Sequence, residues 1–233
     1  MTQLSYSSFS DFFRYYKGLP HQQAALRTLY TSLQSGFPVA LEEESAWVKQ
    51  YRTTPPSPVF TNPLDVPYQS QNDNASGTGY RECFSSSCAM VAMFYKAVKN
   101  DDEYNKIRTR YGDTTDAQAQ IHALRYLGLK ANMITNATSA QLEAQIKEGR
   151  PTPVGWLHKG TVTNPTGGGH WTVVIGHTST HWVHNDPNGE ADLVNGGYVN
   201  AFNGGGILYS RQNWNKRWLI EGTASGWMMD IRK

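Results

Sequence analysis

The chain has 233 residues, of which 17% are charged and 12% aromatic, and its formal net charge is +2. Many aromatic residues with little net charge argue against disorder, and the balance of charges excludes the basic surface typical of a nucleic-acid-binding protein. Only two cysteines are present, which excludes a disulfide scaffold and a cysteine-rich zinc module. The apolar runs are too short for a transmembrane helix. We therefore expect a globular protein with no nucleic-acid partner and no membrane insertion.

The first fifty residues have a helical pattern. Residues 1–10 lack the basic start and apolar core of a secretory signal. Between residues 10 and 51, apolar side chains recur at spacings of three and four, and glycine and proline interrupt them twice. We predict a small helical module at 1–52 and a proline-rich linker at 53–63. The main domain is predicted at 64–233.

The main domain changes its pattern halfway. Helices are predicted at 84–98, 116–126 and 139–147, and short strands separated by glycine turns at 154–157, 171–176, 182–184 and 218–220. Helices followed by strands predict an α+β domain with a helical half and an antiparallel β half.

The two cysteines occupy different environments in this pattern. Cys83 follows a polar loop and begins a strongly apolar helix, where outward-pointing backbone amides and the helix dipole favour a thiolate. Cys88 lies five residues further on, beside Ala89 and Ala92, and is expected to pack as a small buried hydrophobe. Packing roles for both cysteines are the competing interpretation, because cysteine is often buried.

A histidine and an acid lie on two neighbouring predicted strands. Gly169-His170 leads into one strand, and Asn185-Asp186 ends the next. A hairpin turning at Thr178 places His170 opposite Asp186, where side chains meet across an antiparallel pair. This register requires a loop of odd length or a bulge.

The sequence also contains candidate metal ligands and tryptophans that could line a groove. His177, His181 and His184 match no standard zinc spacing and are expected at turns or on the surface. A calcium loop at 72–74 lacks the bidentate glutamate. We expect no metal and no cofactor. Trp156, Trp171, Trp182 and Trp214 are candidates to line a groove, although tryptophans at such spacing are more often core residues.

Several local sequences together resemble the bacteriocin-processing, C39-like family of papain-like cysteine peptidases. They are Val66-Pro67-Tyr68-Gln69-Ser70-Gln71, Cys83-x-x-x-Ser87-x-Ala89-Met90-Val91, Gly169-His170-Trp171 and Asn185-Asp186-Pro187. The resemblance implies a papain-like fold, a triad of Cys83, His170 and Asp186, and an oxyanion-hole glutamine at Gln71, with Gln69 as the alternative. Phe84 departs from the small residue that often follows the family cysteine.

Segments 153–160 and 210–218 are similar to phage and cyanobacterial relatives of this family. That similarity implies an endolysin that hydrolyses stem or cross-link peptides of peptidoglycan. It would be held in the host cytoplasm and released to the wall by another factor, or carried by the virion. The N-terminal helices would contact the wall or the virion. The alternatives are a protease acting on proteins or leader peptides, and a catalytically silent wall-binding or virion module.

Overall fold

The structure is a computed structural model that describes residues 63–233. The helical module predicted at 1–52 and the linker predicted at 53–63, apart from Pro63, lie outside the described residues. The elements are the 3₁₀ turns η1 (Gln71–Asp73) and η2 (Gly79–Arg81), the helices α4 (Cys83–Phe94), α5 (Asp101–Arg108), α6 (Ala117–Tyr126), α7 (Ser139–Lys147) and α8 (Arg211–Trp218), and the strands β1 (Lys130–Ala137), β2 (Thr152–Trp156), β3 (His170–His177), β4 (His181–Asn185), β5 (Glu190–Ala191), β6 (Tyr198–Asn200), β7 (Ile207–Ser210) and β8 (Gly226–Arg232).

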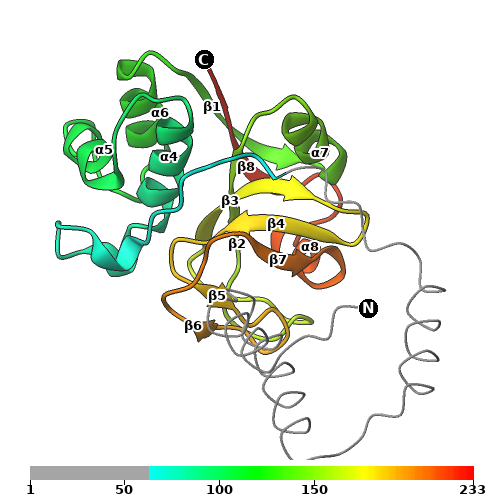
Figure 1. The fold of residues 1–233 in the computed structure, drawn as a ribbon. Helices are drawn as coiled ribbons and strands as arrows, with labels where there is room; N and C mark the ends of the chain where they lie inside the picture. The colour runs from blue at the N-terminus through cyan, green and yellow to red at the C-terminus, as the bar shows by residue number, and fades with distance from the viewer. Residues whose placement is uncertain (1–62) are drawn as a thin grey trace, which may run out of the picture. The chain divides into compact units, whose positions relative to one another are not determined.

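A six-stranded antiparallel sheet forms the centre of the described part, with strand order β1-β8-β2-β3-β4-β7 (Figure 1). The short strands β5 and β6 pair separately below its edge. The predicted combination of helices with an antiparallel sheet is therefore confirmed. No helix within residues 63–233 has both the length and the apolar character needed to cross a membrane.

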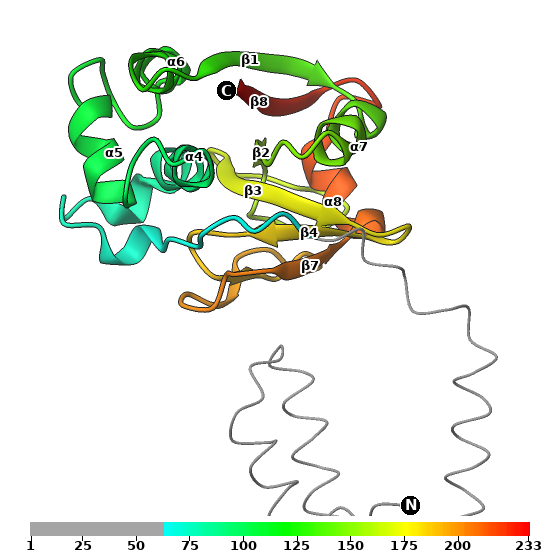
Figure 2. The ribbon, with the colours of Figure 1, turned by 45° about the horizontal axis from the view of Figure 1, so that its top comes forward.

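The sheet is covered by helices on both faces. Figure 2 shows α4, α5 and α6 on one side and α7 and α8 on the other. Alternate residues of the strands supply the two cores: Val173 and Met229 pack with α4, whereas Val174 and Met228 pack with α7 and α8. This alternation is the expected consequence of strand geometry, because successive side chains point to opposite faces.

Two predicted helices begin close to where their local signals place them. The Thr138 hydroxyl accepts from the Gln141 backbone N–H while the Gln141 side chain accepts from the Thr138 N–H, a capping box that starts α7. The Asp116 carboxylate caps α6 by accepting a hydrogen bond from the Gln118 backbone N–H. These boundaries are set by residues within one turn of the helix.

The predicted helix at 84–98 is shorter than expected. It ends at Phe94 because Lys96 adopts a left-handed conformation with φ of 60°. The Ala97 N–H then donates to the Ala92 carbonyl and the Lys96 N–H to the Met93 carbonyl, which is a Schellman termination.

The strand predicted at 218–220 is wrong. Trp218 is the last residue of α8, and the final strand lies further on at β8. The Ser210 hydroxyl caps α8 at the Asn213 N–H, and Trp214 and Trp218 lie one helical turn apart with ring centroids separated by 5.0 Å. The spacing of these two tryptophans is thus a helical signal.

Candidate active site

Cys83 is the first residue of α4, and it is the partly exposed member of the cysteine pair. The next nine residues of the helix are buried, so α4 is packed along most of its length while its first residue reaches the surface. Cys88 is fully buried and unpaired, and burial raises the pKa of its thiol. The structure therefore separates an accessible thiol from a packed one, as the sequence predicts.

His170 is the first residue of β3 and is only 4% exposed. Its Nε2 lies 2.8 Å from Asp186 Oδ1, and the Cys83 thiol is close enough to influence the pKa of the ring. Because Nε2 is taken by the carboxylate, Nδ1 is the ring nitrogen left for the thiol. Burial alone lowers the pKa of His170, but the charge and hydrogen bond of Asp186, together with the Cys83 contact, outweigh it and raise the pKa to about 10.

The predicted register of this hairpin is wrong, although the contact forms. Val173 pairs with Asn185, and a bulge at Ile175 shifts the ladder before the turn. Continuing the register by one residue places Asp186 opposite Thr172, two positions from His170 on the same face. A diagonal neighbour at this spacing is within reach of a long side chain. The imidazole and the carboxylate therefore meet diagonally.

Asp186 is fully buried, and its carboxylate has several donors. The Tyr209 hydroxyl donates to Oδ2 at 2.8 Å, and the Asn188 backbone N–H donates to Oδ1 at 2.9 Å. The Tyr209 oxygen in turn accepts from the Ala191 N–H at 2.9 Å. Burial, followed by the charge of Asp186, raises the pKa of Tyr209 well above its usual range, so Tyr209 stays a hydrogen-bond donor. These donors offset the cost of burying the carboxylate.

The sequence did not single out Tyr209, because its role depends on pairing between β4 and β7. Trp182 pairs with Tyr209 in that ladder. No local pattern around Tyr209 indicates that its hydroxyl points at an acid 23 residues earlier.

The two candidate glutamines differ in their surroundings. Gln71 is 3% exposed, its Nε2 donates to the Gly79 carbonyl at 2.9 Å, and its backbone N–H donates to Pro187. Gly79 lacks a side chain because a Cβ there would lie 2.0 Å from the Gln71 carbonyl oxygen. Gln69 donates only to the carbonyl of its neighbour Tyr68. The buried, doubly anchored Gln71 is the better placed of the two, beside the residue that follows Asp186.

A cavity of about 250 Å³ lies where β2 ends and β3 begins, and its lining does not include Cys83, His170, Asp186 or Gln71. Gly169 and Trp171, the residues on either side of His170, line it together with Trp156 and Trp227. Two of the four tryptophans proposed for a groove therefore line this cavity. Trp182 and Trp214 are fully buried in the core instead.

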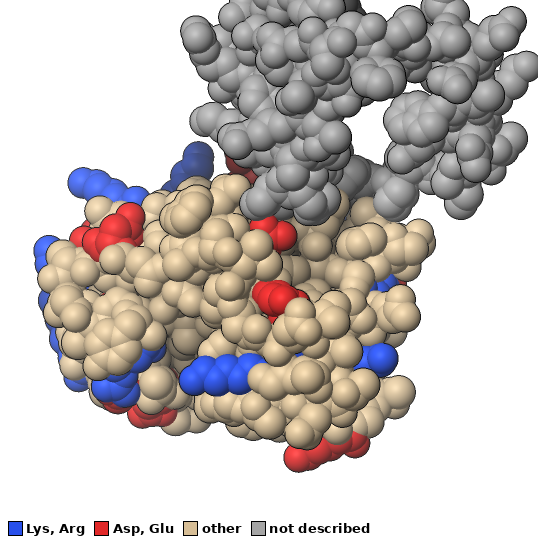
Figure 3. All heavy atoms as spheres, turned by 90° about the horizontal axis from the view of Figure 1, so that it is seen from below, with Lys and Arg blue, Asp and Glu red and all other residues tan. Residues whose placement is uncertain are grey.

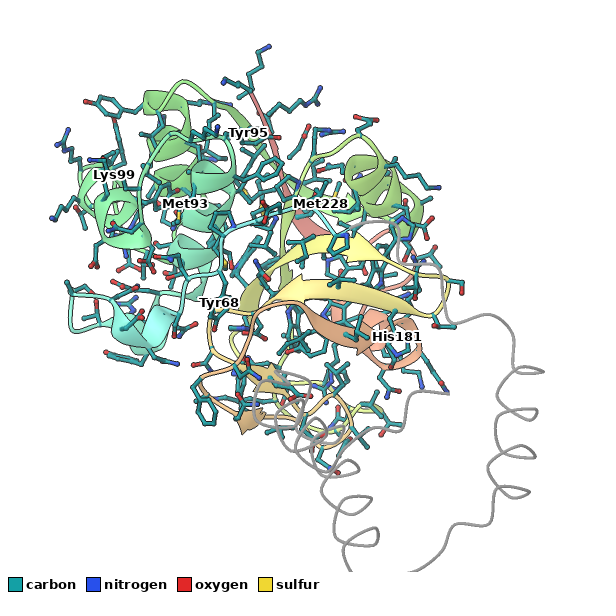
Figure 4. All side chains as sticks on the ribbon, viewed as in Figure 1. Tyr68, Met93, Tyr95, Lys99, His181 and Met228 are labelled. Carbon is teal, nitrogen blue, oxygen red and sulfur yellow. The ribbon has the colours of Figure 1, made fainter. Side chains whose placement is uncertain are left out.

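Of the histidines expected at turns or on the surface, His177 ends β3 next to the turn at Thr178 but is buried. The expectation is wrong for His184, which is buried within β4. His184 Nδ1 lies 2.9 Å from Thr172 Oγ1 of the neighbouring strand β3. Burial lowers the pKa of His184 well below its usual value. His181 lies at the opposite end of the sheet from Tyr68, where β4 begins (Figure 4). Within residues 63–233, no three His, Cys, Asp or Glu side chains are grouped so that they could hold a metal ion.

His158 is a neighbour of the site that the sequence did not reveal. Its ring centroid lies 5.5 Å from that of His170 and 6.0 Å from that of Tyr198. Burial and the nearby charge of His170 lower the pKa of His158 to about 4, so it is neutral at pH 7. One charged and one neutral imidazole thus stand side by side. A charged imidazole close to the Cys83 thiol suits nucleophilic chemistry at sulfur.

A helix that begins at a cysteine and packs on an antiparallel sheet carrying a buried His–Asp pair defines the papain-like cysteine peptidase class. Comparison with known protein families places the chain in one family of this class. The model of the Peptidase_C39 like family matches residues 63–219, and the chain belongs to this family.

Three solved structures are similar to the chain. One is a double glycine motif protease from an AMS/PCAT transporter in complex with the leader peptide, with 19% identity, a TM-score of 0.47, and coverage of 75% of this chain and 96% of that chain. The peptidase domain of Streptococcus ComA, a bifunctional ABC transporter involved in quorum sensing, has 16% identity, a TM-score of 0.43, and coverage of 66% and 92%.

The third is a protein assigned as a C39-like peptidase from Bacillus anthracis, with 15% identity, a TM-score of 0.49, and coverage of 76% and 98%. No curated protein matches the chain.

Proposed function

We propose that the protein hydrolyses peptide bonds with Cys83 as nucleophile, His170 as acid and base, and Asp186 as the residue that orients His170. The observation that carries this proposal is the buried His170–Asp186 pair, 2.8 Å apart, which also contacts the Cys83 side chain. Cys83, His170 and Asp186 are distant in sequence but lie together in the fold. Of the three, only Cys83 is partly exposed.

The reaction proceeds by acyl transfer. The Cys83 thiolate attacks the peptide carbonyl carbon, and protonated His170 gives its proton to the leaving amine as the C–N bond breaks. The resulting thioester is then attacked by water, whose proton passes to His170, and the thiolate leaves. Asp186 holds the imidazole orientation and stabilises its charged form throughout.

The tetrahedral intermediate carries a negative oxygen, and we assign its donors to the Gln71 side-chain amide and the Cys83 backbone N–H. One Gln71 amide hydrogen is used by the Gly79 carbonyl, which fixes the amide and leaves the second hydrogen for the oxyanion. Each such donor contributes roughly 3–4 kcal/mol to the transition state.

The substrate we propose is a stem or cross-link peptide of peptidoglycan. Glycine backbone, tryptophan rings and the charged residues Arg217 and Glu221 line the cavity near the start of β3, and the glycines leave room there for a peptide with small residues. Uncharged side chains also cover most of the described part of the face in Figure 3, with charges of both signs scattered among them. The similarity of 153–160 and 210–218 to phage relatives supports the same choice.

The test compares wild-type protein with Cys83→Ala on purified cell walls. Wild-type protein should reduce the turbidity of the suspension and release new amino termini from muropeptides, and the variant should do neither. Mass spectrometry of a parallel digest of double-glycine leader peptides identifies the alternative substrate class. Cleavage of leaders alone would overturn the wall assignment, and unchanged activity of Cys83→Ala would overturn the cysteine mechanism.

A further inference from the structure

Glu82, the residue before Cys83, is a buried carboxylate that the reaction described above does not use. It is 2% exposed and precedes the first turn of α4, where its carbonyl accepts from the Ser86 N–H. A buried charge in this position is costly unless many donors compensate it. Those donors come from two separate parts of the chain.

The first set of donors lies in the loop between η1 and η2. The Asn74 side-chain amide and the Ser76 hydroxyl donate to Glu82 Oε2 at 2.6 and 2.9 Å, and the Thr78 hydroxyl donates to Oε1 at 2.8 Å. Three alternate residues of one loop thus turn their side chains toward a single carboxylate. The carboxylate therefore sets the path of this loop.

The second set comes from α5. The Asn105 amide donates to Oε2 at 3.3 Å, and the Arg108 guanidinium lies 3.9 Å from Oε1. Both side chains are buried, and Arg108 also donates to Asn105 Oδ1. The loop is therefore fixed against a helix as well as against the start of α4.

The loop that Glu82 holds leads directly to the two oxyanion donors. Thr78 precedes Gly79, whose carbonyl accepts from Gln71 Nε2, and Cys83 follows Glu82. We propose that Glu82 is a positioning residue that fixes the Gln71 amide and the Cys83 N–H relative to each other. This inference rests on the proposed function, because it concerns the oxyanion site of that reaction.

Glu82→Gln is the informative substitution. A glutamine keeps the size of the side chain but replaces one acceptor oxygen by an NH₂ group, which cannot accept from the loop or face Arg108 favourably. The Gln71 amide and the Cys83 N–H then lose their fixed separation. Interactions made only in the transition state are lost, so kcat falls while KM changes little.

Two reagents separate this role from a general loss of structure. N-acetylglycine p-nitrophenyl ester acylates Cys83 through a tetrahedral oxyanion and releases p-nitrophenolate, whereas iodoacetamide alkylates the thiolate by displacing iodide without one. We expect Glu82→Gln to slow acylation by about 10- to 100-fold, which is less than the roughly 100- to 1,000-fold cost of removing an oxyanion donor, because the donors are misaligned and not removed. Alkylation should stay within about 3-fold of wild type, because it requires no oxyanion donor.

The exposed acid Glu148 provides a control, since Glu148→Gln makes the same charge change far along the chain and should alter neither rate. Thr78→Val, at an exposed position, removes one loop donor and should slow acylation selectively by about 3- to 10-fold. The double variant Glu82→Gln/Thr78→Val should be acylated no more slowly than Glu82→Gln alone, because both changes remove the same contact.

Equal slowing of both reactions, or unchanged acylation in both Glu82→Gln and Thr78→Val, would overturn the role of Glu82. Absence of Cys83-dependent acylation in the wild-type protein would instead count against the proposed peptidase reaction.

Discussion

Phe84 and Trp171 stack face to face, with ring centroids 3.7 Å apart and an angle of 5° between the planes. Phe84 directly follows Cys83, and Trp171 directly follows His170. The far side of the Trp171 ring packs on Gly155, where a Cβ would lie 2.9 Å from the ring. The stack therefore links the start of α4 to β3 and β2, and it fixes the spacing between the thiol and the imidazole.

Phe84→Leu should weaken catalysis more than it weakens the fold. Leucine still fills much of the site, so we expect a loss of about 1–2 kcal/mol in the free energy of unfolding. Without the ring stack, Cys83 and His170 are no longer held at a fixed separation, and turnover should fall about 10-fold or more. Urea denaturation and the rate of substrate cleavage measure the two effects.

Phe94→Leu is the matched control, because Phe94 lies at the other end of the same helix and packs partly against the same core. It should cost comparable stability and leave turnover within about 2-fold of wild type. A similar loss of turnover in both variants would show that the Phe84–Trp171 stack has no special role in positioning the site.

The position of Phe84 also shows what sequence reasoning could not supply. A phenylalanine after the cysteine stands out as a departure from the usual small residue, but its partner Trp171 is 87 residues away and is revealed only by packing. Cys83 at a helix start and the bounds of α7 follow from local signals and were predicted. The bulge at Ile175, which decides how His170 meets Asp186, has no comparable local signal.

The difference between local and tertiary signals also explains which hydrogen-bond partners of Asp186 and Glu82 could be predicted. Asp186 could be predicted beside His170 because both lie on neighbouring strands. Its donor Tyr209 is brought to it by the β4–β7 ladder, and the donors of Glu82 on α5 by the packing of α5 against α4. Such contacts depend on tertiary structure, whereas caps and helical periodicity are local.

Asp186→Asn should change the pH dependence of cleavage. In the wild type the carboxylate raises the pKa of His170 above its ordinary value of 6.5, so the imidazolium needed to protonate the leaving amine persists into the alkaline range. An asparagine keeps a hydrogen-bond acceptor but removes the charge, and the imidazolium then loses its proton at lower pH. We expect the alkaline limb of kcat/KM to move down by at least about one pH unit, together with a large fall in its maximum.

The pH profile of cleavage by wild type, Asp186→Asn and the exposed Asp65→Asn measures this shift. Asp65→Asn should reproduce the wild-type profile. An unchanged alkaline limb in Asp186→Asn would mean that a group other than the imidazolium of His170 limits cleavage at high pH.

Asp101→Asn should change how stability depends on pH. Asp101 begins α5 and is 5% exposed, and burial, only partly opposed by the hydrogen bond from Ser86, raises its pKa to about 6 from 3.8. Between these two values the folded state binds the proton that the unfolded state releases. The contribution of this group to stability is therefore present at low pH and is lost as pH rises from about 4 to about 6.

The variant has no titrating group at position 101, so its stability relative to wild type should increase across that window by about 1–3 kcal/mol and then stay constant to pH 7. Urea unfolding of both proteins at pH 4, 5, 6 and 7 gives this difference directly, and effects of the other carboxylates cancel in it. A difference that stays constant from pH 4 to pH 7 would show that Asp101 titrates at the same pH in the folded and unfolded states. A rise confined to that window would show that burial of Asp101 favours its protonated form in the folded state, against the hydrogen bond from Ser86.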